Sequence, residues 1–228
     1  MNQRRIRFYA ALIGAGLLAG CQNAPTPVPG TAPAAGTPAD EKPVVILKQP
    51  DNSIVHSASG MRFPERVGDF KRVSWGQSGL RDRYFTCEYK SSVPGEQVAA
   101  TVFIYPAPSV TANSTEGLIR ETRPAMADSE YQTEVKRVRA EHPQATGNWA
   151  KEISLAQGVQ RKLGRCVEFD YTDLSGHRPQ PVTSRLYLFN DADDRWAVKF
   201  NVTFPKGFPA DKLIGEFMAE LHWTLRDT

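Results

Sequence analysis

The sequence contains 228 residues, 40% of them hydrophobic and 23% charged, with a formal net charge of +3. The basic excess lies entirely in the first 20 residues, which hold three arginines and no acidic residue, so 25 basic and 25 acidic side chains follow. Proteins that bind nucleic acid usually carry a basic excess clustered on one face, so we expect no nucleic-acid partner.

The chain opens with a basic start and a short apolar stretch that ends in a cysteine, MNQRRIRFYAALIGAGLLAGC. The stretch from Phe8 to Ala19 is shorter than the ~20 apolar residues that a membrane-spanning helix needs. An ordinary secretory signal peptide would explain its charge and length, but not a cysteine directly after Leu18-Ala19-Gly20.

The segment Leu18-Ala19-Gly20-Cys21 resembles the lipobox of bacterial lipoproteins. In that family the cysteine thiol receives a diacylglycerol, the preceding peptide is then cut, and the new amino terminus is acylated. The resemblance implies a signal peptide over residues 1–20, lipidation of Cys21 and a lipid anchor in the membrane. The family's inner-membrane retention residue, an aspartate after the cysteine, is replaced here by Gln22. In a Gram-negative source this implies the outer membrane, with the domain facing the periplasm; a plain cleaved signal peptide is the alternative.

Residues 22–43 have the composition of a tether, with six prolines and no aromatic residue. Such a segment buries too little surface to offset the entropy of ordering, and it spans at most about 70 Å at roughly 3.1 Å per residue. A spacer that holds the domain clear of the membrane and a disordered leader of no tuned length both fit. Residues 44–228 then form a single predicted domain, a size sufficient for its own core.

Apolar and polar residues alternate with period two in several segments, which predicts antiparallel strands with one buried face. We expect a strand from Gly68-Asp69-Phe70 onward and three strand pairs after it. The segment Val98–Tyr105 is apolar on both faces, so it is predicted to be central in the sheet and covered on both sides. The three pairs are Phe85–Tyr89 with Val98–Tyr105, Trp149–Leu155 with Val159–Tyr171, and Ser184–Phe189 with Trp196–Phe204.

Two helices are predicted. Asn113 followed by Glu116 is typical of a capping box, and the helical pattern runs towards Glu141. Pro124 is expected to break or kink this segment, which would give two helices. After Asp211, apolar residues recur at helical spacing and predict a closing helix that faces the core: Leu213, Ile214, Phe217, Met218 and Leu221.

These elements predict an α+β fold, an antiparallel sheet with helices packed on it. The order resembles the PsbP/Mog1-like sandwich family over most of residues 60–225. The resemblance rests on Met61-Arg-Phe-Pro64 before the strand at Phe70, the mid-chain helix, and the terminal helix after Phe204-Pro205. Members of that family do unrelated jobs, so the resemblance implies a fold and no activity.

Two cysteines remain if Cys21 is acylated. An oxidising compartment would allow Cys87 and Cys166 to form a disulfide. Alternation, however, places Cys87 with Phe85 and Tyr89, and Cys166 with polar neighbours, so the two side chains can point to opposite faces of one sheet. A bridge and two separate thiols are both open.

No catalytic or metal-binding pattern is found, and we expect no cofactor. The four histidines do not stand at metal-ligand spacing: His56, His142, His177 and His222. The segments Asp173–His177 and Asp191–Asp194 are typical of turns, and the second lacks the glycine and glutamate of a calcium loop. The basic group Lys136, Arg137 and Arg139 is flanked by glutamates and indicates a solvated helix face.

Trp75 stands beside Gly76-Gln-Ser-Gly79, which we interpret as a loop, and it is the best candidate for an exposed aromatic contact. The leading hypothesis is a non-enzymatic, lipid-anchored module that binds an envelope protein or helps to assemble an envelope complex. The alternative is a carrier or sensor of a small apolar ligand held between sheet and helix. An enzyme of unrecognised type is the third possibility.

Overall fold

The computed structural model describes residues 45–78, 84–93, 95, 97–107, 116–157, 160–174, 178–189 and 196–221. Residues 43–172 and 181–228 form one compact unit. Several predictions lie outside the described residues: the signal peptide, Cys21, the tether, and positions Asn113, His177, 191–194 and His222. Among the helices that are described, none is long and apolar enough to cross a membrane.

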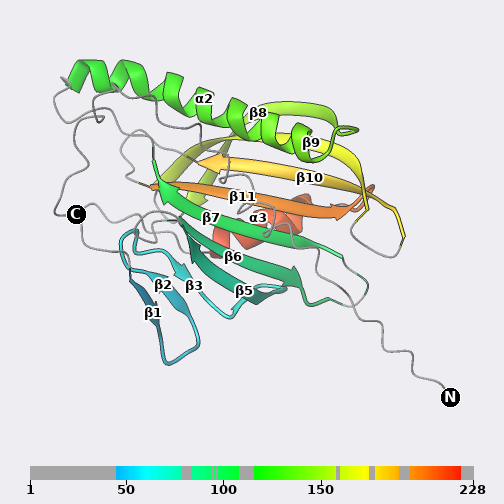
Figure 1. The fold of residues 1–228 in the computed structure, drawn as a ribbon. Coiled ribbons are helices and arrows are strands. Elements are labelled where there is room, and N and C mark those ends of the chain that lie inside the picture. The colour runs from blue at the N-terminus through cyan, green and yellow to red at the C-terminus, as the bar shows by residue number, and fades with distance from the viewer. Residues whose placement is uncertain are drawn as a thin grey trace, which may run out of the picture. The chain divides into compact units, whose positions relative to one another are not determined.

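An eight-stranded sheet dominates the fold, in the order β4-β5-β6-β7-β11-β10-β9-β8 (Figure 1). Its strands are β4 (Arg66–Val67), β5 (Phe70–Ser78), β6 (Tyr84–Ser91), β7 (Ala99–Pro106), β8 (Thr146–Gln157), β9 (Gln160–Asp173), β10 (Gln180–Phe189) and β11 (Trp196–Pro205). A separate three-stranded sheet contains β1 (Ile46–Lys48), β2 (Ile54–His56) and β3 (Arg62–Phe63). The described helices are α2 (Glu116–Glu141) and α3 (Asp211–Glu220).

The predicted antiparallel sheet with helices is confirmed. The three predicted strand pairs are present as β6–β7, β8–β9 and β10–β11, each antiparallel. The β7 strand lies between β6 and β11, as expected for a segment that is apolar on both faces. The alternation in β11 also holds, because the buried side chains include every second residue from Trp196 to Phe204.

One face of the large sheet carries the main core. Buried residues at matching positions follow one another across four strands: Cys87, Val102, Phe200 and Tyr187. Helix α3 covers part of this face, and the Phe217 ring centroid lies 4.5 Å from that of Phe70 and 5.2 Å from that of Tyr89. The small sheet covers another part with Ile54 and Phe63, which are fully buried in the same core. The apolar face is thereby removed from water by two separate elements.

Helix α2 covers the opposite face of the sheet, across β8 to β10 (Figure 1). Tyr131, Val135 and Val138 recur at helical spacing and pack on buried side chains of the sheet. Those side chains are Val167, Phe169 and Tyr171 of β9 and Val182, Leu186 and Leu188 of β10. The sheet is therefore the central layer between a helix on one face and a helix plus a small sheet on the other.

The expectation that Pro124 breaks the mid-chain helix is wrong, because α2 is continuous from Glu116 to Glu141. A proline inside a helix removes one main-chain hydrogen bond and costs about 3 kcal/mol. Packing of the later half of α2 on the sheet offsets that cost. The predicted closing helix is confirmed as α3, whose buried residues include Ile214, Phe217 and Met218.

The β1–β2 hairpin was not predicted. Its turn is stabilised by the Oδ1 of Asp51. This oxygen accepts one hydrogen bond from the main-chain N–H of Ser53 at 3.2 Å and another from the Ser53 hydroxyl at 2.7 Å. Asn52 takes a left-handed conformation (φ 61°), which asparagine tolerates better than most residues. Arg62 of β3 donates to the same hydroxyl at 2.9 Å. The hairpin is therefore held by side chains as well as by its short strands.

Gly164 of β9 tests the packing of the large sheet. A Cβ at this position would lie 2.6 Å from the Phe189 ring and 2.7 Å from the Leu188 carbonyl oxygen. We predict that Gly164→Ala lowers the free energy of unfolding by about 1–3 kcal/mol through overpacking, measured by chemical denaturation. The control is Gly215→Ala in α3, where no atom lies within 4 Å of the new Cβ. It should stabilise by up to about 1 kcal/mol. Equal stabilities of the two variants would contradict this packing.

Candidate functional site

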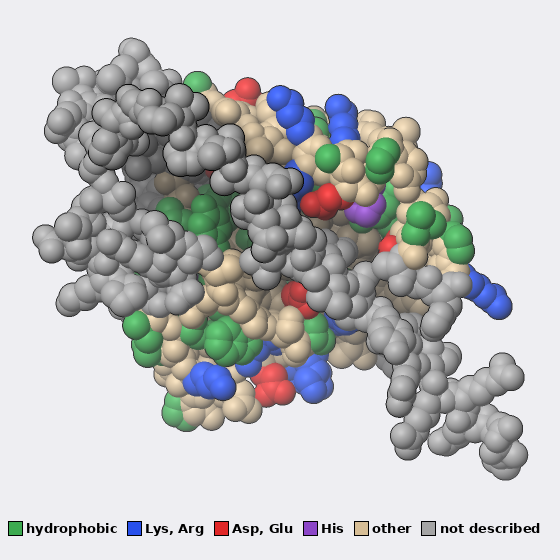
Figure 2. All heavy atoms as spheres, in the orientation of Figure 1, with side chains coloured by type: hydrophobic (Ala, Val, Ile, Leu, Met, Phe, Trp, Pro, Cys, Tyr) green, Lys and Arg blue, Asp and Glu red, His purple; other side chains and the backbone are tan. Residues whose placement is uncertain are grey.

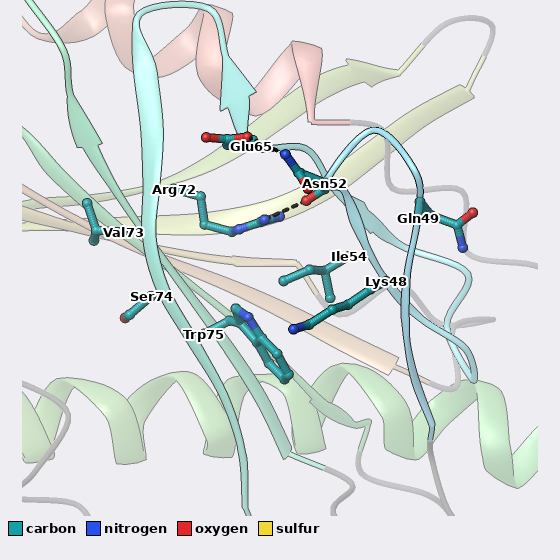
Figure 3. Close-up of a pocket in the computed structure, with 9 residues that line it drawn as sticks. All are labelled: Lys48, Gln49, Asn52, Ile54, Glu65, Arg72, Val73, Ser74 and Trp75. Atoms are coloured by element: carbon teal, nitrogen blue, oxygen red, sulfur yellow. Dashed lines mark hydrogen bonds between the residues drawn. The ribbon is translucent and has the colours of Figure 1, made fainter.

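A groove of about 370 Å³ lies between the β1–β2 hairpin and strand β5 (Figure 3). The hairpin and β5 supply most of its lining, and Glu65 lies between them in the chain. Figure 3 shows Lys48 and Ile54 of the hairpin pointing towards Trp75 of β5, whereas Val73 points away. The lining residues are Lys48, Gln49, Asn52, Ile54, Glu65, Arg72, Val73, Ser74 and Trp75.

Trp75 lies in β5, and residues Gly76 to Ser78 continue this strand. The expectation that this segment is a loop is therefore wrong. The Trp75 side chain is 40% exposed, and its inner face stacks on Phe85 with ring centroids 6.3 Å apart. The Lys48 ammonium group lies 5.9 Å from the centroid of the Trp75 ring. Trp75 thus joins the core on one side and the groove on the other.

Strand β5 has an open outer edge in the part of the sheet that the structure describes. Its outer neighbour, β4, pairs only with Phe70 and Lys71. The N–H of Arg72 donates to the Glu65 carbonyl oxygen at 2.9 Å, and the register with β6 then shifts between Arg72 and Ser74. From Val73 to Ser78, no described strand pairs with the outer side of β5.

The main chain of Trp75 faces this open edge. On β6, the N–H of Ser91 donates to the Val98 carbonyl oxygen, which lies on the β7 side. Main-chain groups alternate in direction along a strand, so Cys87, four residues earlier, also points to β7. Cys87 is the register partner of Trp75, and Trp75 therefore directs its own N–H and C=O away from β6. Trp75 thus lines the groove and directs its main-chain hydrogen-bonding groups to the open edge beside it.

Arg72 joins the two walls of the groove. Its guanidinium donates to the carbonyl oxygens of Phe63 and Asn52. The Asn52 amide donates in turn to Glu65 at 3.1 Å (Figure 3). These bonds connect the hairpin turn, β3 and the start of β5, and they give the groove a defined width.

The groove carries more positive than negative charge, because Lys48 and Arg72 face one carboxylate, Glu65. Arg66 of β4 and Lys71 of β5 are exposed as well, on the face of the sheet opposite the buried Val67 and Phe70. Within the described residues no ion pair joins Lys48, Arg66 or Lys71 to a carboxylate. In the lower part of Figure 2, where Figure 1 shows the small β1–β3 sheet, basic, acidic and hydrophobic side chains are mixed on the surface. An acidic and partly apolar ligand would suit such a lining.

Cys87 and Cys166 are free, buried thiols, so of the two open alternatives the structure has separate thiols. They share one face, because Cys87 aligns with Tyr187 across the sheet and Cys166 lies beside Tyr187. Four strand spacings separate them, roughly 19 Å, whereas a disulfide needs Cα atoms within about 7 Å. Burial raises the pKa of each thiol to about 12, which disfavours the reactive thiolate.

Lys199 is buried on the opposite face, although its position in the alternation of β11 suggested nothing unusual. Its ammonium pairs with Glu134 of α2 at 2.9 Å and lies 4.2 Å from the Phe103 ring centroid. Arg137 also binds Glu134, at 2.6 Å, so Arg137 does not belong to the solvated helix face that we expected. Burial lowers the pKa of Lys199, and the attraction of Glu134 opposes that shift. This network holds α2 on the sheet.

His56, the last residue of β2 in the hairpin, is fully buried. Its Nδ1 lies 2.7 Å from the Ser59 hydroxyl, and its ring meets that of Trp196 edge-on at 4.7 Å between centroids. No hydrogen-bond partner reaches its Nε2 among the described residues. Burial lowers the pKa of His56 to about 4, so the ring is neutral at pH 7.

The other residues that the sequence singled out were not predicted to form a site, and several of them lie outside the described residues. His142 stacks on Tyr171 with centroids 3.9 Å apart. In the described part of the chain, no group of three His, Cys, Asp or Glu side chains could hold a metal ion. Neither a scan of protein-family models nor a search of the curated proteins finds a match to this chain. The groove along β5 is therefore the best-supported candidate site.

His56 makes the stability of the domain depend on pH. Its pKa is about 4 when folded against about 6.5 when unfolded, so acid protonates the unfolded chain first. We predict that the neutral His56 ring contributes fully to the free energy of unfolding above pH 6.5. As the pH decreases to 4, this contribution falls by about 3 kcal/mol. Denaturation at several pH values should show a steeper loss for the native sequence than for His56→Asn. Equal slopes, or an NMR titration of His56 near pH 6.5, would contradict this.

Proposed function

We propose that this chain is a lipid-anchored lipoprotein of the cell envelope whose domain is a non-enzymatic binding or assembly module. The anchor is proposed at Cys21, on the lipobox-like sequence that precedes it. The proline-rich segment over residues 22–43 would then place the domain away from the membrane. In a Gram-negative host the proposed location is the outer membrane, facing the periplasm.

The observation that carries the binding role is the placement of Trp75. Its indole is 40% exposed, its main chain faces outward, and both border one groove. Exposed aromatic side chains are frequent energetic centres of protein interfaces, and an open strand edge offers hydrogen bonds to any extended chain. The groove is lined by Lys48, Glu65 and Arg72 as well as by apolar groups, which gives an apolar-ligand carrier less support.

The order of elements supports a finer proposal, that the fold is a PsbP/Mog1-like sandwich. Helix α2 follows the first strands and lies on one face of the sheet, and α3 closes the chain on the other face. An experimental structure that superposes on members of that family over both helices and the central strands would test it. A different strand order in that superposition would refute it.

Lipidation is tested with the full chain in its native host. We predict that an alkyne-labelled palmitate is incorporated into the native protein and into Cys166→Ser, and that both are found in the membrane fraction. Cys21→Ser should lose the label and the membrane association, because the acceptor thiol is gone. Label on Cys21→Ser would contradict the proposed anchor, independently of any result on binding.

Binding through the groove is tested by site-specific crosslinking. A photoreactive amino acid at position 75 should capture a discrete envelope protein in the native host. The matched control is position 163, because Leu163 on β9 is 63% exposed and distant in strand order. The partner should be absent there and should be lost when Arg72→Ala opens the groove. The same proteins crosslinked at both positions would contradict a binding role for the β5 edge.

A further inference from the structure

Resting on the proposed function, we propose that the ligand of this groove is an extended, acidic segment of a partner protein that adds to β5 as an extra strand. Three features of the groove determine this conformation and charge. They are the direction of the main chain at Trp75, the limit that β4 sets on the edge and the charges of the lining side chains.

The main chain supplies the first argument. Trp75 directs its N–H and C=O away from β6, as the register partner of Cys87. A strand that adds to an edge forms its bonds with such outward groups, and the side chains beside the edge select its sequence. The Trp75 indole lies beside these groups, so one residue offers both kinds of contact.

The position of β4 limits where the ligand can pair. Strand β4 occupies the edge at Phe70 and Lys71, and the N–H of Arg72 donates to the Glu65 carbonyl oxygen. Among the described strands, none pairs with the outer side of β5 at Trp75. An added strand can therefore pair with β5 at Trp75, and it must end before it meets the β4 turn.

The charges supply the chemistry. Lys48 and Arg72 line the groove against a single carboxylate, Glu65. Arg66 and Lys71 carry positive charge on the other face of the same edge, opposite the buried Val67 and Phe70. Arg72 uses its guanidinium on two carbonyl oxygens, so its charge is not neutralised by those bonds. Acidic side chains at alternate positions of an added strand would share one face and lie towards Lys48 and Arg72.

Two other occupants fit less well. A second copy paired through β5 would bring two sets of Lys71, Arg72 and Lys48 together, and like charges at a strand edge oppose such pairing. The chain's own segment 22–43 contains six prolines, each without the N–H that a strand needs. An acidic segment of another protein meets neither obstacle.

The experiment uses the full lipidated chain in detergent micelles and a phage library of random 12-residue peptides. Selection on the native chain with counter-selection on Trp75→Ala should enrich peptides that alternate β-branched or aromatic residues with Asp or Glu. Their affinity should fall about tenfold or more in Trp75→Ala and remain unchanged in Leu163→Ala, the matched surface control. Circular dichroism and thermal melting verify that each variant is folded.

Two further measurements identify strand addition and charge pairing. Methylating the peptide nitrogens one at a time should weaken binding about tenfold at every second residue and little at those between, because only alternate amides face β5. Lys48→Glu should reverse the preference, so that a peptide with Lys in place of its central acid binds this variant better than the native chain. Native affinity for the acidic peptide should fall with salt.

The outcomes separate this inference from the proposed function. Enriched peptides without an acidic bias, or an N-methyl scan without period two, would overturn the inference even when a partner is crosslinked at position 75. A concentration-dependent dimer that Trp75→Ala abolishes would identify a second copy as the occupant and overturn it also. The absence of both enriched peptides and a crosslinked partner would reject the binding role itself.

Discussion

Burial of both faces of one large antiparallel sheet is the constraint on which the rest of the structure depends. The central strands β7 and β11 are apolar on one face and half-buried or buried on the other, so each face needs a cover. Helix α2 covers one face through Tyr131, Val135 and Val138, among its described side chains, and through the Glu134–Lys199 pair. On the other face, α3 and the small β1–β3 sheet each cover part of the core. The small sheet covers part of the core and also lies beside β5. The groove is the space between its hairpin and that strand.

This arrangement explains why the candidate site is at an edge and not between layers. Phe85, Cys87 and Tyr89 of β6 fill the interior beneath the hairpin and α3. At β5 the cover ends, and Trp75 lies half in the core and half in solvent. Natural sheets protect such edges with short neighbouring strands, bulges and positive charges. The β4 turn, the register shift at Val73 and the nearby lysines and arginines are devices of this kind. Such devices oppose pairing between like edges, and in the proposed binding role they leave the edge available to a chain of opposite charge.

Much of the fold could be predicted from the sequence, because period two in β6, β9 and β11 reports burial on one face directly, and the β7 segment is apolar on both faces, as a central strand requires. The exposure of the Trp75 side chain was also predicted, although the segment beside it was expected to be a loop and is part of β5. The β1–β2 hairpin was missed because strands of three residues carry too little alternation to detect. The burial of Lys199 and the continuity of α2 across Pro124 depend on contacts between distant segments. Cys87 and Cys166 show the same limit, since alternation within each strand cannot tell how many strands lie between them.

The central claim is that the main chain of Trp75 is open to a ligand while its neighbour is engaged in the sheet. Hydrogen exchange of the purified full chain, resolved to single amides, tests this most directly. Gly76 is the register partner of Thr86 and faces β6, so its amide should exchange slowly, and the Trp75 amide should exchange much faster. An acidic peptide selected on the groove should then protect Trp75 and leave Gly76 unchanged. Equal protection of the two amides in the free monomeric chain would show that the edge is already paired, and would contradict an open β5 edge.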